Sequence, residues 1–285
     1  MKLLYFCINN NIFISLAAVS LTFETQVQLG MRPQLHPYIF LIFFATLFDY
    51  NLHRFITVIT NKEALNTVKH NWVKRNLYLF YGVVAISIVG FLYTVCVADK
   101  KVLVALAPIA LLTLFYSIPV FKTSKNIFRL REIPFLKIFL ISFVWAASTV
   151  FLPIIQSGIN YDKTIIIAIL LERFLFVFAI TIPFDIRDME VDAKMNLKTI
   201  PAVVGKKRAV IISNCLLVLF LMICAVHYKS TSLIWLNTAY VLSAVSTFYF
   251  INSKKMQAIR FYHYGVLDGT LLLQGVLVLI AYYLH

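Results

Sequence analysis

The stretch that decides the fold is TIPFDIRDMEVDAKMNLKTIP, residues 181–201, which follows the apolar run 165–184. Its three aspartates, spaced i, i+3 and i+7, are Asp185, Asp188 and Asp192. If the helix continues through the stretch, their carboxylates lie within an arc of about 60° and form a row about 10 Å long. Carboxylates this close repel one another unless a cation neutralises them, and hard oxygen ligands suit Mg²⁺ with substrate phosphates. The alternative is a solvated helix end whose acids are balanced by Arg187 and Lys194.

The composition around this stretch is that of a membrane protein. The chain is 61% hydrophobic and only 13% charged, whereas about a quarter of a soluble domain is charged. Apolar runs of about 20 residues, each long enough to cross a bilayer, recur along the whole length. We therefore expect an all-α membrane protein in which residues 1–285 form a single helical bundle in the lipid bilayer. The net charge of +14 fits cytoplasmic loops and anionic headgroups, and we expect no nucleic-acid partner.

Nine ranges are candidates for transmembrane helices: 12–29, 37–55, 77–97, 102–121, 134–157, 164–184, 208–228, 232–252 and 262–284. If the N-terminus is cytoplasmic, the inner segments carry twenty Lys and Arg residues and the outer loops carry five. By the positive-inside rule this predicts a cytoplasmic N-terminus, an outside C-terminus and polar chemistry on the cytoplasmic face of the cell (inner) membrane.

Charged residues inside the predicted spans call for partners, because charge in a membrane is costly unless it faces the bundle interior. Glu172 and Arg173 are adjacent and point about 100° apart, so we expect each to pair with another helix in a structural ion pair. Glu24 is expected far from the aspartate row. Asp268 either faces the cavity or caps an interfacial turn.

The inner ends of the second and sixth predicted spans share a weak sequence similarity. LFDYNLHR at 47–54 and PFDIRDMEVD at 183–192 share a Phe-Asp pair at the predicted cytoplasmic edge. Aspartates from two helices that face each other at one membrane surface would make a two-sided cation site.

The DxxDxxxD row followed by KTIPAVVG at 198–205 resembles the second aspartate-rich motif of the UbiA family of intramembrane prenyltransferases. REIPFLKIFLISFVWA at 131–146 is similar to the start of the family's fifth span, and the resemblance extends over essentially the whole chain. It implies a Mg²⁺-dependent enzyme that moves a polyprenyl group from its diphosphate to a lipophilic, aromatic acceptor, as in quinone biosynthesis. The residues that the resemblance assigns to catalysis are Asp185, Asp188 and Asp49, and those it assigns to the metal are Asp185, Asp188, Asp192, Asp49 and His53.

The first motif is where this chain departs from the family pattern NDxxDxxxD. Over residues 45–53, Ala45 and Thr46 stand at the first two positions, Asp49 matches the third and His53 stands at the fourth. Asp49 and His53 are four residues apart and share a helical face. Histidine suits Mg²⁺ less well than a carboxylate does.

Because the first motif lacks some of the family's acidic ligands, basic side chains have more of the diphosphate charge to neutralise. The candidates near the predicted cytoplasmic ends are Arg54, Lys137, Arg131 and Lys198. The alternative for each is a charge that only sets the topology.

Two other functions stay open at this point. One is a catalytically inactive relative that binds an isoprenoid, as the loss of ligands at Ala45 and Thr46 suggests. The other is a transporter with intramembrane acids, although transporters place such sites near the bilayer midplane and these acids cluster at one surface. The acceptor, the prenyl chain length and the oligomeric state leave no short signature in the sequence.

Overall fold

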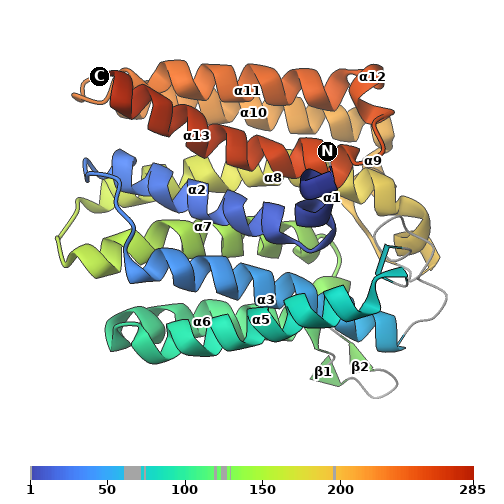
Figure 1. Ribbon diagram of the computed structural model, residues 1–285. Helices are drawn as coiled ribbons and strands as arrows, with labels where there is room; N and C mark the ends of the chain where they lie inside the picture. Colours follow the sequence, from blue (N-terminus) through green and yellow to red (C-terminus); the bar gives the residue numbers. More distant parts are fainter. Residues whose placement is uncertain are drawn as a thin grey trace.

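Long helices run back and forth side by side in a computed structural model that describes residues 2–60, 72–73, 75–118, 121–122, 127–128, 130–194 and 197–285 (Figure 1). The α-helices are α1 Lys2–Asn9, α2 Ile12–Gln28, α3 Pro37–Thr60, α5 Leu77–Val97, α6 Lys100–Ser117, α7 Leu136–Ser157, α8 Lys163–Lys194, α9 Ile200–Val204, α10 Lys206–Tyr228, α11 Leu236–Asn252, α12 Lys254–Gln257 and α13 Asp268–Leu284. A π-helix, Tyr262–Leu267, leads into α13, and a 3₁₀ turn, Leu130–Glu132, precedes α7. The all-α prediction did not include one short antiparallel pair, β1 Phe121–Lys122 and β2 Ile127–Phe128.

Each of the predicted ranges falls on a helix, but the number of membrane spans stays a prediction. Six helices among the described residues are long and apolar enough to cross a membrane, and the bent pair α1 and α2 adds a seventh if it is one span. The six are Pro37–Ile56, Leu77–Val97, Leu136–Ser157, Lys163–Ala193, Lys206–Tyr228 and Tyr262–Leu284. α6 and α11 occupy two further predicted ranges and are not among them.

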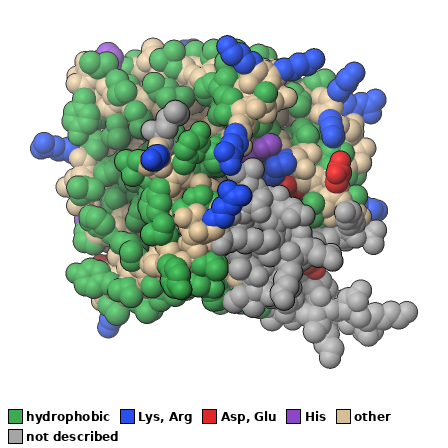
Figure 2. All heavy atoms as spheres, turned by 45° about the vertical axis from the view of Figure 1, so that its right-hand side comes forward, with side chains coloured by type: hydrophobic (Ala, Val, Ile, Leu, Met, Phe, Trp, Pro, Cys, Tyr) green, Lys and Arg blue, Asp and Glu red, His purple; other side chains and the backbone are tan. Residues whose placement is uncertain are grey.

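The surface of the bundle is strongly apolar, as expected of side chains that face lipid. On α5, Tyr78, Val89 and Tyr93 are exposed by 94, 66 and 67%. Figure 2 turns one end of the bundle forward and shows Lys and Arg side chains gathered at its upper right and centre beside a largely hydrophobic flank. The chain ends lie toward opposite ends of the bundle (Figure 1), and the side of the membrane on which each lies stays a prediction.

Part of the charge count behind that orientation lies outside the described residues: Lys62, Lys69, Lys74, Lys125 and Arg129.

The condition on which the aspartate row depended is met, because α8 runs unbroken from Lys163 to Lys194, ten residues beyond the predicted span 164–184. It does so despite Pro183, which has no N–H to donate to the carbonyl of Ala179 one turn earlier. The hydroxyl of Ser213 on α10 donates to that carbonyl instead, at 2.7 Å. The neighbouring helix thus satisfies the carbonyl that proline leaves free, and α8 continues about three turns past Pro183, to Lys194.

The N-terminal helices meet at a sharp break. α1 and α2 are bent by 81°, and Asn11 at the break has a φ of 63°, a left-handed conformation that asparagine tolerates better than most residues. Arg54 from α3 donates to the carbonyl of Asn9 and, at 2.7 Å, to Oδ1 of Asn11. Asn51, one turn earlier on α3, donates to the carbonyl of Asn10 at 3.2 Å. The polar edge of α3 therefore fixes the break.

α2 lies in the middle of the bundle and packs against α13, α3 and α7. Its crossing with α13 is close because Gly275 has no side chain. A Cβ built on Gly275 would come within 2.5 Å of the backbone carbon and oxygen of Ser20. The small residue thus sets the distance between the two helices, as small residues do in membrane bundles.

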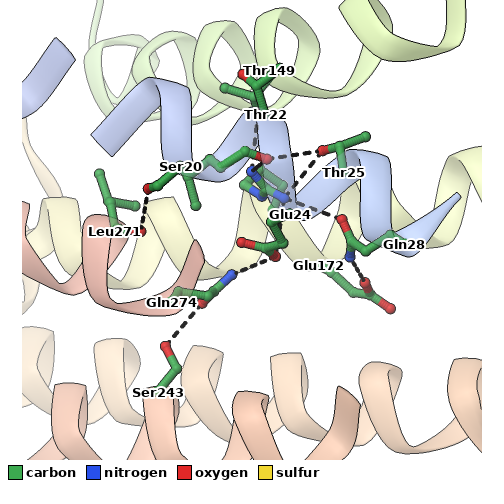
Figure 3. Close-up of polar contacts among 12 residues, drawn as sticks. Ser20, Thr22, Glu24, Thr25, Gln28, Thr149, Glu172, Ser243, Leu271 and Gln274 are labelled. Carbon is green, nitrogen blue, oxygen red and sulfur yellow. Dashed lines mark hydrogen bonds and ion pairs between the residues drawn. The ribbon is translucent and has the colours of Figure 1, made fainter. Parts of the chain in front are cut away.

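A buried polar network joins α2, α8 and α13 (Figure 3). Nη2 of Arg173 lies 3.1 Å from Oε1 of Glu24, and both side chains are 1% exposed. Gln274 on α13 donates to the same Glu24 oxygen at 3.0 Å and accepts from Ser243 on α11 at 3.1 Å. Arg173 also donates to the carbonyl of Leu21 at 2.8 Å. The guanidinium therefore has the partners that a membrane interior demands.

Glu172 belongs to the same network but uses other partners. Its Oε1 lies 2.7 Å from Nδ1 of His227 on α10, and its Oε2 accepts from Gln28 at 2.9 Å and from Tyr228 at 3.1 Å. The prediction that adjacent Glu172 and Arg173 pair with other helices is confirmed. Together they tie α2, α8, α10 and α13 to one another.

Candidate active site

The three aspartates of α8 converge on one ammonium group. Nζ of Lys137 lies 2.9 Å from Oδ1 of Asp185, 3.8 Å from Oδ2 of Asp188 and 3.3 Å from Oδ2 of Asp192. The exposed fractions of these aspartate side chains are 1, 30 and 8%. Two of the three carboxylates are therefore buried, which argues against a freely solvated helix end. The side chain of Lys194 lies outside the described residues.

Lys137 is held in place by the backbone around it. It stands in the first turn of α7, two residues after Phe135, whose φ is 62°. The N–H of Phe135 donates to the carbonyl of Lys198 at 2.9 Å, so the segment after α8 anchors the start of α7. Ile138, the next residue, is buried against Phe178 of α8. These contacts explain how residues far apart in sequence bring an ammonium to the aspartate row.

A cavity of about 730 Å³ opens beside the row, lined by α2, α3, α5, α6, α7, α8 and the start of α13. Its walls are mostly apolar, with Phe48, Phe91 and Trp145 among them. The ionisable side chains that line it are Asp49, Tyr50, His53, Tyr116, Arg131, Lys137, Asp185, Arg187, Asp188, Tyr264 and Asp268. The cavity therefore combines a charged region with a long apolar surface.

The structure brings the two aspartate-bearing helix segments to this one cavity. Asp49 and His53 line it from α3, and Asp185 and Asp188 line it from α8. His53 packs edge-on against Tyr116, with ring centroids 5.9 Å apart. Ala45 and Thr46, which stand where the family pattern has ligands, line the same cavity. Residues of both segments thus contribute to the lining of the same cavity.

Not every residue chosen from the sequence reaches the cavity. Lys137 and Arg131 line it, whereas Arg54, Lys198 and Asp192 are not part of its lining. Arg54 is buried against the break between α1 and α2. The side chain of Lys198 is exposed, and its carbonyl serves the turn before α7. Asp192 joins the site through Lys137.

Sequence reasoning named Arg187 only as a charge that balances the acids and missed its aromatic contacts. Its guanidinium donates to both carboxylate oxygens of Asp188, at 2.7 and 3.0 Å. The same guanidinium lies 5.2 Å from the ring centroid of Phe184 and 5.0 Å from that of Tyr264, within the range of cation–π attraction. The spacing of Phe184 and Arg187, three residues apart on a helix, was a signal for that pair. Nothing in the sequence pointed to Tyr264, which comes from the π-helix before α13.

The sequence left open whether Asp268 faces the cavity or caps an interfacial turn. In the structure it lines the cavity, as Arg187 and Tyr264 do. It is also the first residue of α13.

The donor set fits Mg²⁺ in kind, since carboxylate oxygens are its preferred protein ligands. Oδ2 of Asp185 is buried and accepts no hydrogen bond from the described residues, so it has free capacity. As the side chains stand, however, no three His, Cys, Asp or Glu residues in the described part of the chain are grouped to hold a metal ion. A divalent cation at this row would therefore require the ammonium of Lys137 to move and the carboxylates to come closer together.

Comparison with known proteins places this arrangement in a family. The sequence model described as the UbiA prenyltransferase family matches residues 59–264, well over half of the chain. The chain therefore belongs to the UbiA prenyltransferase family. The match includes the aspartate row of α8 and begins after Asp49 and His53. A search of curated proteins found no match.

Three solved structures share the fold. A UbiA homolog from Archaeoglobus fulgidus bound to GPP and Mg²⁺ superposes with a TM-score of 0.61 at 13% identity, covering 94% of this chain and 96% of that one. A UbiA homolog from the same organism bound to Cd²⁺ superposes with a TM-score of 0.53 at 18% identity, covering 94% of this chain and 95% of that one. A structure of digeranylgeranylglyceryl phosphate synthase superposes with a TM-score of 0.54 at 14% identity, covering 97% of this chain and 98% of that one. At these identities the likeness shows the fold alone.

Proposed function

We propose that this protein is a Mg²⁺-dependent membrane prenyltransferase that moves a polyprenyl group from its diphosphate to a lipophilic acceptor with an aromatic ring. The observation that carries the proposal is the single cavity with an aspartate row at one side and an apolar wall beyond it. Its volume of about 730 Å³ is within the usual range of small-molecule sites, about 300–1,000 Å³. Membership of the UbiA family and the GPP and Mg²⁺ bound to a structural neighbour support it.

In this proposal the charged region binds the diphosphate. Asp185, Asp188 and Asp192 on α8, with Asp49 opposite, would hold Mg²⁺, which neutralises charge on the departing diphosphate when bound. Lys137 and Arg131 line the same region and would donate to the diphosphate oxygens. His53 lies one turn from Asp49 and would add an imidazole nitrogen beside its carboxylate, a donor that suits Mg²⁺ less well than oxygen does.

The apolar wall would take the prenyl chain and orient its first carbon toward the acceptor. The reaction breaks the bond between that carbon and the diphosphate oxygen, forms a bond from the acceptor and releases one proton. Tyr50, Tyr116 and Trp145 line the cavity, and aromatic faces stabilise a developing allylic cation by cation–π attraction. The apolar wall would also limit the access of water that competes with the acceptor. We further propose that the charged region faces the cytoplasm across a cell (inner) membrane, because the Lys and Arg counts favour that orientation.

A second candidate is a catalytically inactive member that binds an isoprenoid or its diphosphate. It is favoured by one observation: Ala45 and Thr46 line the cavity where the family pattern supplies an amide and a carboxylate.

Turnover tests the choice between the two. Purified protein in lipid nanodiscs is given prenyl diphosphates of increasing chain length, Mg²⁺ and an extract of membrane lipids, and diphosphate release is measured. We expect release that depends on Mg²⁺ and that is lost in Asp185→Asn. Binding without release at any chain length would favour the inactive relative.

A further inference from the structure

Lys137 is placed where a cation of the aspartate row would be. Its ammonium lies within 4 Å of carboxylate oxygens from all three aspartates, 2.9, 3.8 and 3.3 Å away. Its position follows from the fold, since Phe135 is bonded to the carbonyl of Lys198 and Ile138 is buried against α8. The ammonium is therefore an element of the site and not a loose surface charge.

The charges around the row are close to balanced without any metal. Three carboxylates carry −3, and two cations contact them among the side chains that the structure describes, Lys137 and Arg187, which carry +2. The two cations also divide the row between them. Arg187 engages both oxygens of Asp188, whereas Lys137 lies closest to Asp185 and Asp192. A divalent cation entering this site would face a net charge of about −1 instead of −3.

One oxygen nevertheless remains unused. Oδ2 of Asp185 is buried, on a residue only 1% exposed, and accepts no hydrogen bond from the described residues. An unpaired carboxylate oxygen in such a place is costly, so the site retains capacity for a further cation. The ammonium therefore covers the row without using all of its ligand atoms.

We propose that Lys137 is a built-in counter-ion that competes with a divalent cation for Asp185, Asp188 and Asp192. The inference rests on the proposed function in so far as the row is taken as its metal site. In the absence of a diphosphate, the tethered ammonium holds the row in a low-affinity state for metal. Removing the charge of Lys137 while keeping the length of its side chain opens the row.

The test is a titration of Mn²⁺, followed by the loss of its free-ion electron paramagnetic resonance signal, with purified full-length protein and no prenyl diphosphate. We expect Lys137→Met to bind Mn²⁺ at least about tenfold more tightly than wild type. Lys137→Arg, which keeps the charge, and Lys207→Met, which removes an exposed charge on α10, should both bind as wild type does. In Lys137→Met/Asp188→Asn the gain should disappear, because the row has lost a ligand.

Equal or weaker Mn²⁺ binding in Lys137→Met overturns the proposal, as does a gain that survives Asp188→Asn. If Lys137→Met is not monodisperse, Lys137→Gln takes its place, because its amide can donate to the row without carrying a charge. Since no diphosphate is present, the result stands whether or not the protein transfers prenyl groups. Tight metal binding in Lys137→Met together with an absence of turnover in the wild type would support this inference and contradict the proposed function.

Discussion

Arg173 of α8 and Glu24 of α2 form an ion pair, Nη2 to Oε1 at 3.1 Å, in which both side chains are 1% exposed. Neither residue lines the cavity, so the pair belongs to the framework of the bundle. Removing one partner leaves the other as an unpaired charge in the buried interior of the bundle, which costs far more than losing the attraction alone.

Arg173→Met should therefore destabilise the protein strongly. We expect its free energy of unfolding in detergent to fall by about 3–5 kcal/mol, because Glu24 is left buried without its cation. Glu24→Gln is the matched comparison, since Arg173 keeps the carbonyl of Leu21 and the side chain of Gln28 as acceptors. The free energy of unfolding of Glu24→Gln should fall clearly less than that of Arg173→Met. Equal losses in the two variants would contradict this account of the pair.

The crossing of α2 and α13 gives a second prediction. Gly275→Ala should destabilise the protein by about 1–3 kcal/mol, because the new Cβ would lie 2.5 Å from backbone atoms of Ser20. Gly82→Ala on α5 is the control, since a Cβ there meets nothing within 4 Å and alanine favours the helix. Thermal unfolding of the two variants in the same detergent makes the comparison. A Gly275→Ala protein as stable as Gly82→Ala would show that the crossing is not close.

Arg131 and Arg54 should differ in their effect on diphosphate binding. Arg131 lines the cavity, whereas Arg54 is committed to Asn9 and Asn11 at the break between α1 and α2. We expect Arg131→Met to weaken binding of a prenyl diphosphate analogue at least about tenfold, a loss of about 1.4 kcal/mol. Arg54→Met should lower the melting temperature and leave the affinity within about threefold. Calorimetric titration and thermal unfolding measure the two effects, and the reverse pattern would refute the assignment.

How far the sequence anticipated this site can be seen along α8. The spacing of Asp185, Asp188 and Asp192 predicted a row on one helical face, because helical geometry is local and depends only on spacing. The partners of Glu172 and Arg173 were predicted in kind, since buried charges need them. The identity of those partners was not, because it depends on how α2, α10 and α13 pack against α8.

The contact between Lys137 and the aspartate row also depends on how distant segments pack, so the sequence did not predict it. It depends on the turn at Phe135 and on a backbone hydrogen bond to Lys198, neither of which has a signal in the sequence. The left-handed Asn11 and the π-helix that carries Tyr264 were likewise not predicted. Arg54 was expected near the diphosphate from its place after Asp49. A helical step of one residue is about 100°, and five residues bring it onto a different face from Asp49.

Restoring the first motif should raise turnover. Ala45 and Thr46 line the cavity, so Ala45→Asn/Thr46→Asp would add an amide and a carboxylate opposite the row. We expect the wild-type protein to release diphosphate and the double variant to release it about tenfold faster, a gain of about 1.4 kcal/mol in transition-state stabilisation. An inert wild type together with an active double variant would instead identify the chain as a member that has lost catalysis.

The most direct test of the central claim is binding of a non-hydrolysable geranyl or farnesyl diphosphate analogue to the purified protein, with and without Mg²⁺. The account predicts binding that requires Mg²⁺ and that is at least about tenfold weaker in Asp188→Asn. Asp162→Asn is the control, because Asp162 is exposed before α8 and asparagine retains an oxygen that can accept from the N–H of Thr164. Absent or metal-independent binding, or binding that Asp188→Asn leaves unchanged, would contradict it.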